Sequence, residues 1–499
     1  MQTTPWAGPF TPAAGPGAVA ARPLRHAVVP TAAARWQVQL PIRMGLFFLA
    51  LVLSLVMGRL IPAFQSPDEI MHLHRADMIA HGQLFLEKTA PDAKGYTGGY
   101  SDLNLIRFAA WMSKIAGVNK ADLSPTWLME QASLHPWAHS KDFVNAVGTA
   151  YYLPLIYLPH AAGLSVSRHL DWSMRASYDF TRAIVTLTVL ALLAWAWALL
   201  PPNLLVRALV LMPMSAFQIL SPTIDGLCIA MALVLGGLVI AQYQQQSSQR
   251  LPLRRWRLVA VYALTFVLVT SRTNLLPLLA IPLLLLCQRC SWPRLGAFVL
   301  LCAASLGWTL FVLLTTMETR IERSHSTLQI LQIYLDDPLY FLGLVGSTVA
   351  HPDKGPFLAH SFVGILGWLD TFIPKSATRA IWVVLVGAAL LAAAQARREE
   401  RQYTALRALL MACAVGSTLL AFFAIAVTWN DYPVAVISGV QGRYFIIQAL
   451  LFALAIGPMA HERTPTQRRM ELGTTTAMAG YFLFVLVGTL YSRYQLAVF

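Results

Sequence analysis

The sequence predicts an all-α polytopic membrane protein with about 11 transmembrane helices, within a range of about 10 to 13. Hydrophobic residues make up 57% of the 499-residue chain and charged residues only 12%, whereas soluble domains average about 25% charged residues. Apolar runs also recur along the chain, and most are long enough to cross a hydrocarbon core of about 30 Å. Both observations exclude an ordinary soluble enzyme.

The apolar runs define a single transmembrane domain over residues 41–499. Residues 1–40 are rich in Ala, Pro and Gly and predict a disordered cytoplasmic tail. We expect the spans at residues 43–62, 178–200, 204–220, 222–240, 257–273, 275–288, 295–316, 378–396, 406–429, 443–460 and 473–492.

The net charge of +14 indicates how the chain is oriented in the membrane and does not indicate a nucleic-acid partner. Arginines fill the short gaps near residues 250–257, 289–294, 397–407 and 463–469, and such gaps face the cytoplasm in bacterial membrane proteins. If residues 146–167 dip into the membrane without crossing it, all these gaps fall on one side. This topology places the N-terminus inside and the C-terminus outside.

Most carboxylates fall on the opposite, external side. Glu399, Glu400, Glu462 and Glu471 are the only cytoplasmic ones of the 23 acidic residues. Two long external loops, 64–145 and 317–375, carry many of the others, and we expect the first to contain short amphipathic helices at the membrane surface. A protein that keeps its carboxylates on one side is expected to work on that side.

The segment Ser66–Asp77 follows the first span and is the first candidate site. If it is helical, with Ser66 as its cap, Asp68 and His72 share a face, as do Glu69 and His72. Two carboxylates and an imidazole together can serve as a general base or bind a metal ion. The same residues can also be solvated charges at a helix N-terminus.

Three further polar segments lie on the external side. Asp225 begins an apolar helix, and acidic groups at membrane depth are costly. Arg272 lies in a tight turn between two apolar helices and can pair with a phosphate or an acid. Arg443 follows two glycines at a helix start, an arrangement that suits phosphate binding. Each of them can instead be a helix cap or an interfacial anchor.

Four motifs together resemble the bacterial domain-of-unknown-function family numbered 2142. They are the Pro-Asp-Glu-x-x-His element of residues 67–72, the segment 214–226, the turn Gly364–Asp370 (GILGWLD) and the turn Gly439–Tyr444 (GVQGRY). The resemblance covers residues 43 to 492. The family in turn resembles the GT-C membrane glycosyltransferases, which use polyprenyl-phosphate-linked sugars on the outer face of the bacterial inner membrane.

The resemblance implies roles for individual residues. Asp68 would be the catalytic base, Glu69 would assist it, and His72 would orient a carboxylate or join a metal site. A divalent cation, if present, would be held by these three residues. Arg443 would hold the donor phosphate, and the other expected substrate-binding residues are Gln441, Tyr444, Arg272 and Asp225.

The expected function is therefore transfer of a sugar from a polyprenyl-phosphate donor to a cell-envelope glycan or lipid, with membrane lipids as further partners. Two alternatives from other classes stay open. One is a transporter or flippase of lipid-linked glycans, and the other is a non-catalytic membrane partner of an envelope assembly complex. The sequence shows few midplane charges, which disfavours transport, and nucleic acid is not an expected partner.

Overall fold

A computed structural model describes residues 32–89, 96–117, 125–247, 255–288, 290–316, 323–396, 403–459 and 464–494. The chain divides into two structural units, Met1–Phe48 and Leu49–Phe499. Helix α1 (Ala32–Gly58) begins within the segment that we expected to be a disordered tail. Residues 32–40 are therefore helical, and residues 1–31 of that tail lie outside the described residues.

The expected all-α, multi-span fold class is confirmed. Within the described ranges, 6 helices are long and apolar enough to cross a membrane. They are α6 (Met174–Leu199), α9 (Ile224–Ser247), α12 (Trp292–Thr315), α16 (Lys375–Ala396), α17 (Thr404–Trp429) and α19 (Pro465–Tyr494). Each coincides with a predicted span.

The other predicted spans also form helices, but shorter or broken ones. These are the apolar part of α1 at Phe47–Gly58, the pair α7 (Leu204–Leu211) and α8 (Pro213–Leu220), α10 (Arg255–Ser271), the pair η3 (Thr273–Leu279) and α11 (Ala280–Gln288), and the pair η5 (Gly442–Phe445) and α18 (Ile446–Ile456). The span count of 11 therefore stays a prediction.

Prolines account for two of the breaks. Pro213 begins α8 directly after α7, and Pro277 lies inside η3. Proline lacks the backbone N–H that a continuous helix needs and clashes with the preceding turn. The sequence pattern of apolar residues continues across both positions, so it predicted uninterrupted spans.

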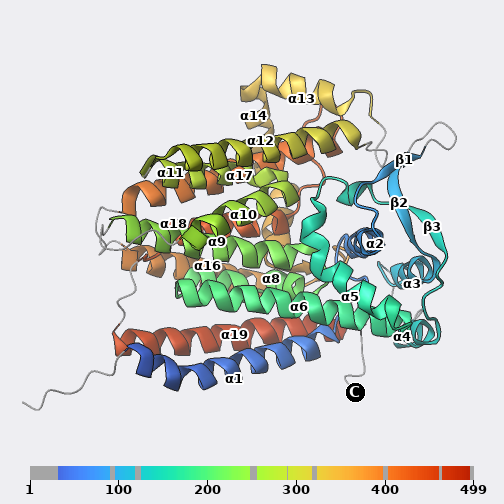
Figure 1. Cartoon of the computed structure of the whole chain (residues 1–499), viewed down its shortest axis with the longest axis horizontal. Helices are drawn as coiled ribbons and strands as arrows, with labels where there is room; N and C mark the ends of the chain where they lie inside the picture. The colour runs from blue at the N-terminus through green and yellow to red at the C-terminus, as the bar shows by residue number, and fades with distance from the viewer. Residues whose placement is uncertain are drawn as a thin grey trace, which may run out of the picture. The chain divides into compact units, whose positions relative to one another are not determined.

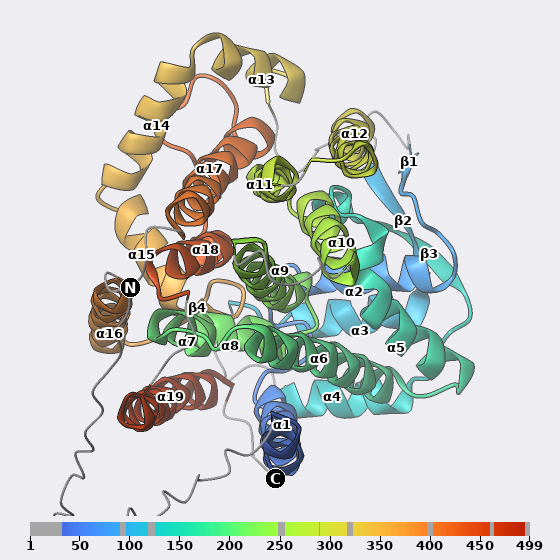
Figure 2. The same cartoon turned by 60° about the vertical axis from the view of Figure 1, so that its left-hand side comes forward.

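Helix α9 is the core of the unit Leu49–Phe499. It is apolar on all sides. Of its most apolar 18-residue stretch 89% is buried, whereas the corresponding share for α12 is 17%. A helix that is apolar all round belongs in an interior. Helices α6, α10 and α18 pack around it, and Figure 2 shows α9 between α10 and α18, with α6 below it. The exposed Val299, Leu300 and Leu310 of α12 fit a lipid-facing surface.

The segment that we expected to be the first external loop, residues 64–145, folds at one end of the bundle. It contains α2 (Glu69–Ala80), α3 (Leu103–Ser113) and α4 (Pro125–Leu134), as expected for amphipathic helices. It also contains an antiparallel sheet of β1 (Glu87–Thr89), β2 (Tyr96–Asp102) and β3 (Lys141–Asn145), which the sequence did not predict. Helix α5 (Leu158–His169) follows, and Figure 1 shows α2, α3 and the sheet together beside the ends of the long helices.

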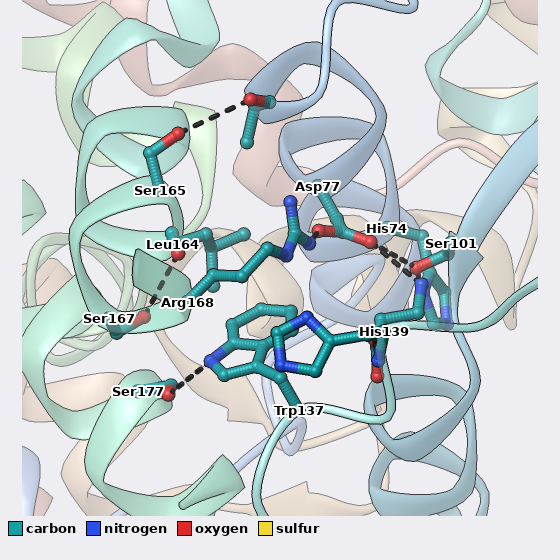
Figure 3. Close-up of polar contacts among 12 residues, drawn as sticks. His74, Asp77, Ser101, Trp137, His139, Leu164, Ser165, Ser167, Arg168 and Ser177 are labelled. Carbon is teal, nitrogen blue, oxygen red and sulfur yellow. Dashed lines mark hydrogen bonds and ion pairs between the residues drawn. The ribbon is translucent and has the colours of Figure 1, made fainter. Parts of the chain in front are cut away.

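A buried polar cluster joins α2 to β2 and α5 (Figure 3). Asp77 of α2 forms an ion pair with Arg168 of α5 and accepts hydrogen bonds from the Ser101 hydroxyl (3.0 Å) and the Asp102 N–H (2.9 Å). The Arg168 guanidinium lies 4.2 Å above the Trp137 ring. With its oxygens satisfied, the buried Asp77 carboxylate orients α2 against β2 and α5.

The segment that we expected to be the second external loop contains α13 (Thr327–Asp336), α14 (Pro338–Ala350), α15 (Lys354–Gly364) and a hairpin of β4 (Ile365–Leu366) and β5 (Thr371–Phe372). As predicted, α14 and α15 are too short to span a membrane. Figure 2 shows α13 and α14 beside α17, and Ile330 and Phe341 share an apolar cluster with Phe422 of α17.

Candidate functional site

Asp68 lies between α1 and α2. Its backbone is left-handed, with φ 63°, and it occupies the N-cap position of α2. The Glu69 N–H donates to the Ser66 carbonyl oxygen (3.2 Å), so the expected cap by the Ser66 side chain is wrong. The Asp68 carboxylate instead accepts a hydrogen bond from Arg443 Nη2 at 2.6 Å. Asp68 therefore faces a cation rather than capping its own helix.

The glycines of the GVQGRY turn bring Arg443 to this position. Gly439 has φ +86°, and any side chain at Gly442 would collide with backbone atoms of Leu358 and Phe362 in α15. A residue other than glycine cannot make this approach without moving α15. Arg443 is thereby the second residue of η5, with its side chain only 3% exposed, and its Nε donates to Gln441 Oε1 at 2.7 Å.

Asp225 and Arg272 complete a network of four charged residues. Asp225, in the first turn of α9, forms an ion pair with Arg272, which directly follows α10. Arg443 Nη1 lies 3.4 Å from Asp225 Oδ2. The order along the network is Arg272, Asp225, Arg443 and Asp68, so positive and negative charges alternate and sum to zero. Such pairing is what makes charges tolerable near an apolar interior.

The four residues line a cavity of about 180 Å³. Tyr152 lies under the Arg272 guanidinium and Tyr444 under that of Arg443, each with 5.2 Å to the ring centroid. One part of the wall is polar and the other is apolar, including Ile229, Leu275, Ala421, Ile425, Ile446 and Ile447. The cavity can therefore take a small anionic group together with the start of an apolar chain.

A larger cavity of about 950 Å³ lies on the other face of α17 and α18. Its lining is almost wholly apolar, with His351, Thr418 and Gln448 among the exceptions. It offers space for hydrocarbon, whereas the charged groups suited to acid–base or phosphate chemistry line the smaller cavity.

Glu69 and His72 flank Asp68 but face other groups. The Glu69 carboxylate is fully buried and accepts hydrogen bonds from the Phe64 N–H (3.0 Å), the Ser66 N–H (2.9 Å) and the Tyr178 hydroxyl. His72 Nδ1 bonds to the Tyr157 hydroxyl at 2.8 Å, and burial lowers the pKa of His72 to about 3. The imidazole is therefore neutral at physiological pH.

These partners bear on the expected divalent cation. Among the described residues, no group of three or more His, Cys, Asp or Glu side chains could hold a metal ion. The three expected ligands do not fit one metal site, because their polar atoms face different groups. The Asp68 carboxylate faces Arg443, the Glu69 carboxylate faces backbone N–H groups, and the His72 imidazole faces Tyr157. The cation stays a prediction.

The sequence matches the family described as "Predicted membrane protein (DUF2142)" over residues 47–453. The chain belongs to this family. No curated protein sequence matches the chain. The solved structure of ArnT from Cupriavidus metallidurans bound to undecaprenyl phosphate is similar over 91% of this chain and 78% of that chain, with 13% identity and a TM-score of 0.23.

All four motifs expected of a DUF2142 protein contribute to this region. Trp368, in the GILGWLD turn, donates from Nε1 to the Phe64 carbonyl oxygen at 2.8 Å. Gln218, within the 214–226 segment, lines the cavity with Asp68 and Arg443. Partial desolvation raises the pKa of Asp68, but the Arg443 guanidinium, together with Arg272, outweighs it, and the pKa lies below its usual value. Asp68 is therefore a carboxylate at neutral pH.

Sequence reasoning missed part of the lining of this DUF2142 site. Tyr151, Tyr152, Gln218, Asn274 and Thr428 all line the cavity. Tyr151 and Tyr152 begin an apolar stretch that is typical of a membrane-embedded segment, and Gln218 is a neutral residue inside a predicted span. Asn274 alone had a usable signal, because it lies close to Arg272 in the same external turn.

Proposed function

We propose that this protein is a GT-C-type glycosyltransferase of the bacterial inner membrane. It moves one sugar from a polyprenyl-phosphate donor to an envelope glycan or lipid on the periplasmic face. The observation that carries the proposal is a half-exposed carboxylate, Asp68, beside the buried guanidinium of Arg443 in a cavity with an apolar wall.

The two sides of the cavity suit the two parts of such a donor. Arg443 and Arg272 supply the planar, permanently charged groups that bind phosphate oxygens in pairs. The apolar side near Leu275, Ile446 and Ile447 suits the first isoprene units. A cavity of about 180 Å³ is below the usual ligand-pocket range of about 300–1,000 Å³, which favours a single sugar over an oligosaccharide.

The reaction follows from these positions. Asp68 takes the proton of an acceptor hydroxyl as that oxygen attacks the anomeric carbon. The bond from the anomeric carbon to the phosphate oxygen breaks, and its electron pair leaves with the lipid phosphate. Arg443 and Arg272 stabilise the second negative charge that the phosphate gains. No other reactant is needed.

The charge distribution supports a periplasmic site. Arg255 begins α10 and Arg272 directly follows it, so the helix separates them by about 25 Å along its axis. The end with Arg255 belongs to an arginine-rich gap, residues 250–257, and positive-inside placement puts that end in the cytoplasm. The cavity then opens at the opposite surface. The gap residues 248–254, 397–402 and 460–463 lie outside the described residues.

A complementation experiment tests the proposal. Envelope glycans and lipids from a deletion strain are compared by mass spectrometry after complementation with wild type, Asp68→Asn or Asp171→Asn. Asp171 is an exposed carboxylate paired with His139 away from the cavity, so its substitution controls for loss of one negative charge. We expect one sugar modification to disappear in the deletion and to return with wild type and Asp171→Asn only.

Two results would overturn the proposal. One is an unchanged set of glycans and lipids in the deletion strain. The other is full restoration by Asp68→Asn at wild-type membrane levels, which would leave transport or assembly as the function.

A further inference from the structure

Resting on the function proposed above, we propose that Asp68 occupies, in the free protein, the place at Arg443 that the donor phosphate takes. Donor binding would then itself release the Asp68 carboxylate for the acceptor hydroxyl. The base would become available only after the donor is in place, so the donor binds first.

Arg443 has little capacity left for an additional anion. Its Nε donates to Gln441, its Nη1 lies 3.4 Å from Asp225, and its Nη2 donates to Asp68 at 2.6 Å. These partners take three of the five N–H donors of the guanidinium, and because its side chain is only 3% exposed, the protein covers most of the rest. A phosphate that reaches Arg443 must therefore replace one of the present partners.

Of the two carboxylates on Arg443, Asp68 is the one that leaves more easily. Asp225 is 16% exposed and is held by both Arg272 and Arg443. Asp68 is 50% exposed and, among the described residues, forms its ion pair with Arg443 alone. Displacing Asp68 breaks one ion pair and returns a carboxylate to a solvated position, whereas displacing Asp225 breaks two.

The backbone around Asp68 allows this exchange without refolding. Glu69 holds the backbone N–H groups of Phe64 and Ser66, and Trp368 holds the Phe64 carbonyl oxygen. The loop therefore stays in place while the Asp68 side chain rotates about its own bonds.

Charge balance supports the same exchange. The two arginines and two aspartates sum to zero, so a phosphodiester donor brings the site to a net charge of −1. While Asp68 stays paired with Arg443, the charge of Arg443 is neutralised and attracts the donor phosphate only weakly. Once Asp68 moves away, the phosphate faces Arg443 directly. After transfer, Asp68 carries the acceptor's proton and the phosphate carries two charges, so the net charge is unchanged.

The test measures the affinity of the full-length, detergent-solubilised protein for farnesyl monophosphate, with farnesol as the uncharged control. The proteins are wild type, Asp68→Asn, Arg443→Gln, the double variant and Asp171→Asn. We expect Asp68→Asn to bind farnesyl monophosphate about tenfold more tightly than wild type, because the competing carboxylate is gone. Arg443→Gln should bind farnesyl monophosphate weakly. The double variant should have the same affinity as Arg443→Gln alone.

The outcomes separate this inference from the proposed function. Equal or weaker binding by Asp68→Asn, while wild type prefers farnesyl monophosphate to farnesol, overturns the exchange alone. Binding of farnesyl monophosphate no tighter than farnesol in every variant overturns the lipid-phosphate donor, and the exchange with it. Asp68→Ser removes the same charge and replaces Asp68→Asn if that variant does not fold.

Discussion

Substitution of Glu69 distinguishes most clearly between a catalytic role and a positioning role for this residue. Its carboxylate accepts three hydrogen bonds, from the N–H groups of Phe64 and Ser66 and from the Tyr178 hydroxyl. Arg182, itself largely buried, donates to the Tyr178 hydroxyl and to the Gly58 carbonyl oxygen. The loop that carries Asp68 is therefore held from inside the protein, with Phe64 and Asp68 both in left-handed backbone conformations.

Replacing Glu69 by glutamine turns one acceptor oxygen into an NH₂ group. One of the three donors then meets another donor, and an unsatisfied buried group costs about 1–3 kcal/mol. Glu69→Ala leaves all three donors without their acceptor, so its cost should be at least about 3 kcal/mol. We expect the thermal midpoint of purified protein to fall slightly for Glu69→Gln and strongly for Glu69→Ala.

The same variants are assayed for the sugar modification in the complemented deletion strain, with exposed Glu130→Gln on α4 as the matched control. We expect Glu69→Gln to retain activity in proportion to folded protein, unlike Asp68→Asn. Loss of all activity in Glu69→Gln with an unchanged thermal midpoint would refute the positioning role and assign Glu69 to the chemistry.

Three further predictions concern other parts of the site. Gly442→Ala should abolish activity, because the new methyl group collides with the backbone of α15 and displaces Arg443; the control variant Gly387→Ala, in open space on α16, should be active in the same assay. Since the pKa of His72 is about 3, the pH–activity profile should show no inflection near the usual histidine value of about 6.5; an inflection there that disappears in His72→Gln would contradict this. Burial raises the pKa of Asp370, but the Gly117 N–H, Arg493 and Thr371 outweigh it and hold the pKa below its usual value. Asp370 should then stabilise the protein above about pH 4 and lose this effect as the pH falls through its folded-state pKa, so thermal midpoints of wild type and Asp370→Asn should differ at pH 7 and converge at low pH.

Much of the fold could be predicted because membrane spans have a strong compositional signal. The expected span at residues 178–200 became α6, and that at 406–429 became α17. The sheet of the first external loop was missed for a physical reason. Strand β2, with the sequence YTGGYSD, has two central glycines, which are typical of a turn, and β1 has only three residues. Its pairing partner β3 lies about 40 residues further along the chain.

The sequence singled out the charged residues that the structure brings together, but not the positions that backbone geometry decides. Asp68, Asp225, Arg272 and Arg443 were conspicuous because charged groups next to apolar helices need partners. Helical periodicity put Glu69 on one face with His72, but the left-handed backbone at Asp68 and the donors around Phe64 turn Glu69 inward. Tyr152 and Gln218 are neutral, so nothing in the sequence separated them from ordinary span residues.

The wide spacing of the four charged residues has a consequence for biosynthesis. Asp225 and Arg272 leave the ribosome close together, but Arg443 follows Asp68 by 375 residues. At about 5–20 residues per second, Asp68 waits roughly 20–75 s for its partner while the intervening helices insert. A chain that stalls before η5 thus exposes an unpaired carboxylate. If Arg443 holds the donor phosphate as proposed, transfer can begin only once η5 has been made.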